Sequence, residues 1–96
     1  MRVAVIGGIQ TLARDYDRTV TQQGHTCVLY NVYSSDMLTK LRGTGAIVLF
    51  TRTVSHQAAG VARSIAHKAG IPLVCPTGSG VSSLRRCLDE LVSPRS

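Results

Sequence analysis

The chain has 96 residues, 44% of them hydrophobic and 17% charged, and its eleven Lys and Arg against five Asp and Glu give a formal net charge of +6. This composition excludes a disordered chain, and apolar runs such as 46–50 are far shorter than the roughly 20 residues of a membrane span. Residues 1–8 are too short for the apolar core of a signal peptide, so we expect a cytoplasmic protein. A domain this small gains stability by burial against a second copy, which predicts a homodimer.

The charged residues and the thiols limit the classes of partner. The basic residues are spread along the chain, and its four aromatic residues do not alternate with them as in a stacking platform, so nucleic acid is a disfavoured partner. The positive charge instead favours an anionic small molecule. Cys27, Cys75 and Cys87 show no CxxC spacing, which argues against a disulfide framework or a zinc knuckle. We predict three reduced thiols.

The first half of the chain alternates strand and helix patterns. Residues 2–6 predict a buried strand, and residues 10–23 predict a helix with apolar positions at helical spacing. Residues 25–30 predict a second strand. Ser34 or Ser35 is then suited to cap a short helix that carries Met37, Leu38 and Leu41.

The second half repeats this alternation. Residues 46–50 form a continuous apolar strand, as expected where helices cover both faces of a parallel sheet. Ser55 is a natural N-cap for a third helix that ends at Gly70, and its apolar face consists of small residues, namely Ala58, Ala59, Ala62, Ile65, Ala66 and Ala69. Residues 71–75 predict a fourth strand. The last helix carries the stripe Val81, Leu84, Leu88, Leu91 and Val92, and Pro94 prevents its extension.

Four strand–helix repeats with short glycine-containing loops indicate an α/β fold. We predict a small open parallel sheet of four strands with helices on both faces, a Rossmann-like or flavodoxin-like three-layer sandwich. The strand order expected by analogy with other doubly wound sheets is 2-1-3-4. A single domain should cover residues 1–93, followed by a short tail at 94–96.

Several segments resemble a known family. They are "VAVIGG" at the start, the helix that contains Tyr16 and ends at Gly24, "TVSHQA" after the third strand, and "SGVSSL" at the start of the last helix. Together they resemble the bacterial domain of unknown function family 2325, over nearly the whole chain. The most specific element is Val54-Ser55-His56 with a small residue two positions on. This resemblance implies a fold but no reaction.

The carboxyl edge of such a sheet is where a ligand binds, and it receives one histidine. His56 follows the third strand. The rise of a strand places His25 roughly 17 Å from this edge, and the rise of a helix places His67 roughly 16 Å from His56. The positive end of the helix dipole favours a neutral imidazole, the form that binds a metal. Gly60 lies one turn further on the same helix face, which leaves room for a flat ligand.

These features suggest a haem or related tetrapyrrole, bound at this edge or between two subunits for sensing, storage or transport. His56 is the predicted iron ligand, with Cys75 or Tyr33 as the weaker candidate and Arg52 at the propionates. The dipeptide Cys75-Pro76 places an accessible thiol at a strand end, and such Cys-Pro dipeptides recur at regulatory haem sites. The predicted cofactor-binding residues are Arg52, Ser55, His56, Gly60, Tyr33, Cys75 and Pro76, and the predicted metal ligand is His56.

Other interpretations remain open. Gly7-Gly8 and residues 77–80 precede helices whose free N–H groups suit a phosphate or nucleotide, although the third glycine of GxGxxG is missing. The chain could also be a dimerising interaction domain without a ligand, in which His56 only holds its loop. No paired carboxylate is expected at the carboxyl edge, and GxSxG and HExxH are absent from the sequence, so an enzyme is the less favoured class. A zinc site on His56 and Cys75 would have only two evident ligands, whereas a catalytic zinc site has three from the protein, so zinc is disfavoured.

Overall fold

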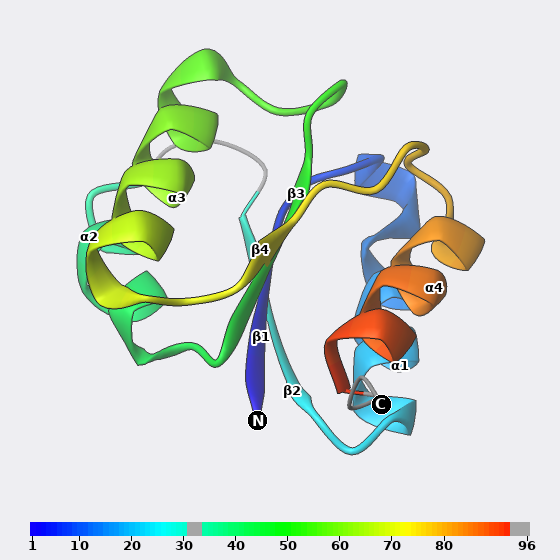
Figure 1. Cartoon of the computed structure of the whole chain (residues 1–96). Coiled ribbons are helices and arrows are strands. Elements are labelled where there is room, and N and C mark those ends of the chain that lie inside the picture. The colour runs from blue at the N-terminus through cyan, green and yellow to red at the C-terminus, as the bar shows by residue number, and fades with distance from the viewer. Residues whose placement is uncertain (31–33, 93–96) are drawn as a thin grey trace.

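A four-stranded parallel sheet forms the middle of the molecule (Figure 1). The structure is a computed structural model and describes residues 1–30 and 34–92. Its strands are β1 (Arg2–Gly7), β2 (Thr26–Tyr30), β3 (Ala46–Phe50) and β4 (Leu73–Val74). Its helices are α1 (Ala13–Gln22), α2 (Met37–Lys40), α3 (His56–Ala69) and α4 (Val81–Val92), with short 3-10 turns η1 (Gln10–Leu12) and η2 (Leu41–Gly43).

The strand order β2-β1-β3-β4 confirms the predicted order 2-1-3-4. In the register of the sheet, Val5 of β1 pairs with Leu29 of β2 on one side and with Val48 of β3 on the other. The two central strands, β1 and β3, are therefore covered on both faces, which explains why their sequences lack a polar interruption. The predicted α/β three-layer architecture is confirmed.

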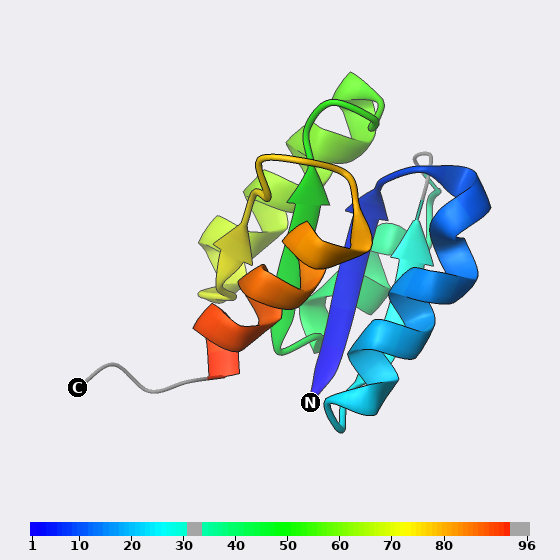
Figure 2. The same ribbon diagram turned by 90° about the vertical axis from the view of Figure 1, so that its right-hand side faces the viewer.

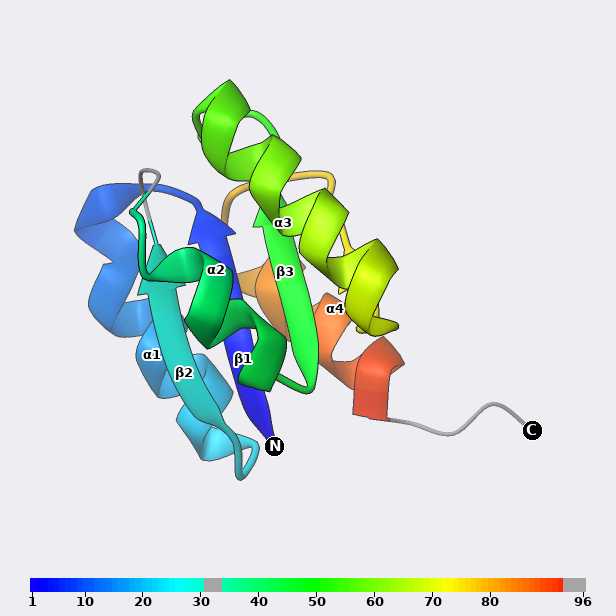
Figure 3. The same ribbon diagram turned by 90° about the vertical axis from the view of Figure 1, so that its left-hand side faces the viewer.

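Helices cover both faces of the sheet. α1 and α4 lie side by side on one face (Figure 2), and α2 and α3 lie on the other (Figure 3). Alternate residues of β1 enter the two core layers, as the period of a strand requires. Val3 and Val5 pack in the layer of α1 and α4, and Ala4 and Ile6 pack in the layer of α2 and α3.

The caps of α3 agree with the sequence. The Ser55 hydroxyl accepts a hydrogen bond from the Ala58 amide at 3.2 Å, and Gly70 ends the helix in the left-handed conformation with φ of +67°. The prediction for α2 was wrong in one respect. Its N-cap is Asp36, which makes no side-chain capping bond, and the Ser34 hydroxyl donates to the Asp36 carboxylate instead.

The fourth strand is shorter than predicted. β4 contains Leu73 and Val74 alone, at the edge of the sheet, whereas the sequence predicted residues 71–75. Pro72 has no amide hydrogen to donate, and its carbonyl accepts from the Ile47 amide at 2.9 Å. Beyond the strand, Pro76 also lacks an amide hydrogen, and residues 75–80 form an irregular segment between β4 and α4.

The sheet covers the centre of each apolar helix face within one chain. Ala58, Ala62 and Ile65 of α3 are buried under the sheet, and so are Leu84 and Leu88 of α4. The rest of these faces is less covered, since Ala69 of α3 is exposed and Val81 and Leu91 of α4 are half-buried. The homodimer stays a prediction.

Candidate functional site

Three loops meet at the carboxyl edge of the sheet and are tied together by Tyr16. The Tyr16 side chain is buried and stacks on Phe50 with ring centroids 5.2 Å apart. Its hydroxyl accepts from the Ile9 amide at 2.9 Å and donates to the Ser79 carbonyl. Thr53 adds a further link, because its hydroxyl accepts from the Gly8 amide at 2.8 Å. The loops after β1, β3 and β4 are thus held as one unit.

Sequence reasoning missed this role of Tyr16. It assigned Tyr16 to the apolar face of a helix and attached no polar contact to its hydroxyl. A tyrosine is amphipathic, so a buried one at the loop end of a helix needs a hydrogen-bond partner nearby. That requirement is the signal that could have identified the contact.

The first glycine loop is tightly packed. Gly7 has φ of +84°, and a Cβ atom there would lie 2.8 Å from the Val54 Cβ. Gly8 has φ of +93°, and a Cβ atom there would lie 2.7 Å from Cε2 of Tyr16. The two glycines are therefore required by the close approach of the neighbouring loop and ring.

The predicted residues His56 and Gly60 line one open hollow. We call it the His56 hollow, and it has a volume of about 400 Å³. His56 and Gly60 lie one turn apart on α3, as expected, and a Cβ atom at Gly60 would meet no heavy atom within 4 Å. The lining residues are Thr51, Val54, His56, Ala59, Gly60 and Arg63.

The arginine of this hollow is not the one that the sequence favoured. Arg63 lines the hollow, two turns of helix beyond His56. Arg52 lies exposed in the turn after β3 and is not among the lining residues. Ser55 is occupied in capping α3. Of the predicted residues, the structure therefore brings His56 and Gly60 together and adds Arg63 to them.

Cys75 and Pro76 lie in a different place. They line a second hollow of about 300 Å³ between the end of β4 and one face of α4, which we call the Cys75 hollow. Cys75 is exposed and Pro76 is buried. The lining residues are Val74, Cys75, Pro76, Thr77, Ser83, Arg86, Cys87 and Glu90. Within one chain, Cys75 and His56 thus do not share a hollow, and Tyr33 lies outside the described residues.

The other two histidines lie away from the His56 hollow. Nδ1 of His25 is 3.1 Å from the N-terminal amine of Met1, in the loop that leads into β2. His67 is exposed in the last turn of α3, at the opposite end of the helix from His56. Within residues 1–30 and 34–92, no three His, Cys, Asp or Glu side chains are grouped closely enough to hold a metal ion.

A family model matches residues 2–91, and its description reads "Uncharacterized protein conserved in bacteria (DUF2325)". The chain belongs to the DUF2325 family. This confirms the resemblance seen in the sequence. Neither a curated protein nor a solved structure matches the chain. None of the helices described is long and apolar enough to cross a membrane.

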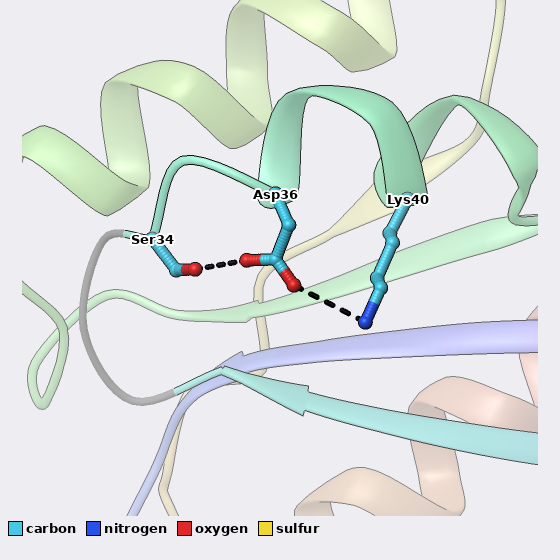
Figure 4. A network of polar contacts seen from close by, with 3 residues as sticks. All are labelled: Ser34, Asp36 and Lys40. Carbon is cyan, nitrogen blue, oxygen red and sulfur yellow. Dashed lines mark hydrogen bonds and ion pairs between the residues drawn. The ribbon is translucent and has the colours of Figure 1, made fainter.

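The start of α2 in this DUF2325 chain carries a polar network of its own (Figure 4). Asp36 accepts from the Ser34 hydroxyl and pairs with Lys40 at 3.1 Å. The hydrogen bond from Ser34 and then that from Lys40 hold the pKa of the Asp36 carboxyl below its usual value. Burial, followed by the charge of Asp36, raises the pKa of the Tyr30 phenol. Ser34, Asp36 and Lys40 thus satisfy one another at the start of the helix, whereas the buried Tyr30 hydroxyl has no hydrogen-bond partner within the described residues.

Proposed function

We propose that the protein binds a haem or a related tetrapyrrole in the His56 hollow. The observation that carries the proposal is the arrangement of an imidazole, a bare backbone and a guanidinium along one exposed face of α3. His56, Gly60 and Arg63 occupy helix positions i, i+4 and i+7 and line the same hollow. We propose binding for sensing, storage or transport, without catalysis.

The spacing suits a flat ligand that carries carboxylates. With a rise of about 1.5 Å per residue, Gly60 is about 6 Å and Arg63 about 10.5 Å from His56 along the helix axis. A macrocycle held by the imidazole would lie over Gly60, where no side chain interferes. Its carboxylates would then reach Arg63, whose guanidinium suits bidentate pairing. Val54 and Ala59 supply apolar contact beside the ring.

Gly60 supports a ligand because the fold does not require it. It has an ordinary helical backbone, unlike Gly7 and Gly8 with their positive φ, and the space around it is open. Glycine in the middle of a helix costs about 0.5–1 kcal/mol relative to alanine. A close-approaching ring gives a physical reason for this cost.

The hydrogen bonds of the loop also bear on the role of His56. Thr53 and Ser55 hold the loop through the amides of Gly8 and Ala58. Within the described part of the chain, no hydrogen bond involves the imidazole of His56. The simpler role, a histidine that holds its own loop, thus receives no support from these contacts.

The phosphate or nucleotide module is the less favoured alternative. The amides of Gly8 and Ile9, which would bind a phosphate, already donate to Thr53 and Tyr16. The two glycines of this loop lie against Val54 and the Tyr16 ring, which leaves little room for an anion. For the open side of the His56 hollow we propose a second copy of the chain, because a one-sided hollow leaves the other face of a bound macrocycle uncovered.

Titration of the purified protein with haemin tests the proposal. We expect a Soret band typical of histidine ligation, and His56→Ala should lower the affinity at least about tenfold and change the ligation type. A tenfold loss corresponds to about 1.4 kcal/mol. His67→Ala, on the same helix but at its other end, is the matched control and should change neither property. The titration endpoint gives the number of chains per haem, with two chains expected.

A larger side chain at Gly60 tests whether haemin binding needs the open surface of the hollow, with the proposed iron ligand left in place. Gly60→Leu leaves His56 and Arg63 in place but fills the surface between them, so haemin binding should be lost while the circular dichroism spectrum is retained. If His56→Ala keeps the parent Soret band and affinity while the protein stays folded, His56 is not the iron ligand. The proposed function is then wrong in its central assignment.

A further inference from the structure

We propose that Cys75 and Cys87 form a dithiol–disulfide pair in the Cys75 hollow, oxidised by a low-molecular-weight disulfide such as oxidised glutathione. The inference is independent of haem binding, because the Cys75 hollow lies on the α4 side of the sheet and shares no lining residue with the His56 hollow. Of the three cysteines, these two line one hollow, and Cys27 lies in β2.

Position gives the two thiols different roles. Cys75 is exposed, directly after the short edge strand β4, so an incoming disulfide reaches its sulfur first. Cys87 is half-buried on the face of α4 that forms the opposite wall of the hollow. Burial, then the charge of Glu90 and then that of Cys75 raise the pKa of the Cys87 thiol. Cys75 is therefore the attacking thiol and Cys87 the resolving one.

The inference requires the two sulfur atoms to meet across the hollow that both residues line. Cys75 begins the irregular segment 75–80, just beyond the last ladder pair of β4 at Val74, and the Tyr16 hydroxyl holds this segment at its far end, at the Ser79 carbonyl. Cys87 lies in the middle of α4, which Leu84 and Leu88 anchor in the core. Closure of the disulfide would thus need a shift of the Cys75 end of this segment toward α4, and the open hollow offers the space for it.

The chemistry proceeds in two exchange steps. The Cys75 thiolate attacks the oxidised glutathione, which forms a mixed disulfide on Cys75 and releases one glutathione thiolate. Cys87 loses its proton to solvent and attacks the Cys75 sulfur, which closes the Cys75–Cys87 disulfide and releases the second glutathione thiolate. Two thiols of the protein are oxidised and one molecule of oxidised glutathione is reduced to two thiols.

Mass spectrometry of the reduced full chain after treatment with oxidised glutathione tests the inference. In the Cys27→Ser background, trypsin cuts at Arg85 and Arg86 and separates the two cysteines, so their disulfide joins two peptides. We expect this pair, linked within one chain, as the main product. Cys87→Ser in the same background should instead accumulate the mixed disulfide on Cys75. Cys75→Ser should react at least about tenfold more slowly, because the remaining thiol is shielded.

Three results would overturn the inference. One is a mixed disulfide on Cys75 that persists although Cys87 is present. The second is a disulfide that joins two chains through Cys75, which would make Cys75 an intermolecular thiol. The third is equal reaction rates of Cys75→Ser and Cys87→Ser. Circular dichroism of each variant before oxidation shows whether it is folded, and serine is close enough to cysteine in size to keep the hollow.

Discussion

Replacement of Gly60 by alanine separates what the fold needs from what a ligand needs. Gly60 lies in the middle of α3 with no heavy atom within 4 Å of a Cβ atom built on it. Alanine therefore fits without strain and gains the difference in helix propensity, about 0.5–1 kcal/mol in the free energy of unfolding. For a domain of this size, that gain raises Tm by about 2–8 °C. Haemin affinity should fall, because the methyl group enters the surface over which the ring is proposed to lie.

Thermal and urea unfolding of the ligand-free protein measure the first effect, and haemin titration measures the second. Gly70→Ala is the matched control, since its Cβ atom would also meet nothing within 4 Å but its φ is +67°. We expect this control to lose about 1 kcal/mol or more, because only the backbone conformation opposes it. If Gly60→Ala destabilises the ligand-free protein, the free surface at Gly60 is covered by another part of the assembly. If it stabilises the protein and leaves haemin affinity unchanged, Gly60 is not part of the site.

Two further predictions concern the polar contacts. Tyr16→Phe keeps the stacking on Phe50 but leaves one loop amide and one loop carbonyl without their partner, so urea unfolding should show a loss of about 1–3 kcal/mol; a loss below about 0.5 kcal/mol would mean that water replaces the hydroxyl. Ser34 and then Lys40 lower the pKa of Asp36 in the folded state, so the ionised carboxylate stabilises the fold at pH values above the ordinary aspartate pKa of about 3.9. This stabilisation is lost as the pH falls through the lower pKa of the folded state. Asp36→Asn should therefore flatten the acid side of the stability profile, and an NMR titration that places the Asp36 pKa at or above its usual value would contradict this assignment.

Much of the fold could be predicted because local signals and tertiary requirements agree. The continuous apolar run 46–50 is β3, and it is buried on both faces as its composition required. Ser55 and Gly70 bound α3 because the capping preferences at both ends match the packing of its small residues on the sheet. The edge elements were less predictable. β4 is an edge strand bounded by Pro72 and Pro76, which have no amide hydrogen to donate, and the start of α2 depends on a side-chain pair rather than on a serine cap.

In the candidate site, too, residues on a regular helix were predictable and residues in loops were not. His56 and Gly60 were found because helix spacing fixes which residues share a face, and the same spacing extended by three residues would have found Arg63. Arg52 was favoured because it follows the strand, but a turn residue can point in any direction, and chain order does not fix it. Cys75 was grouped with His56 for a similar reason. Both lie near the carboxyl edge, yet the sheet separates the face of α3 from the face of α4.

This separation makes the two proposals independent of each other. The His56 hollow belongs to α3 and the loop after β3, and the Cys75 hollow belongs to α4 and the end of β4, with the sheet between the two helices (Figure 1). Variants of Gly60 therefore alter one hollow without touching the thiols, and Cys87→Ser alters the other without touching the imidazole. The loops are nevertheless joined, because Thr53 lies next to Val54 of the first hollow while Tyr16 bonds Ser79 beyond the second. Even so, the two hollows share no lining residue, so oxidation of Cys75 and Cys87 should leave the haemin affinity unchanged, and a changed affinity would contradict the independence of the two sites.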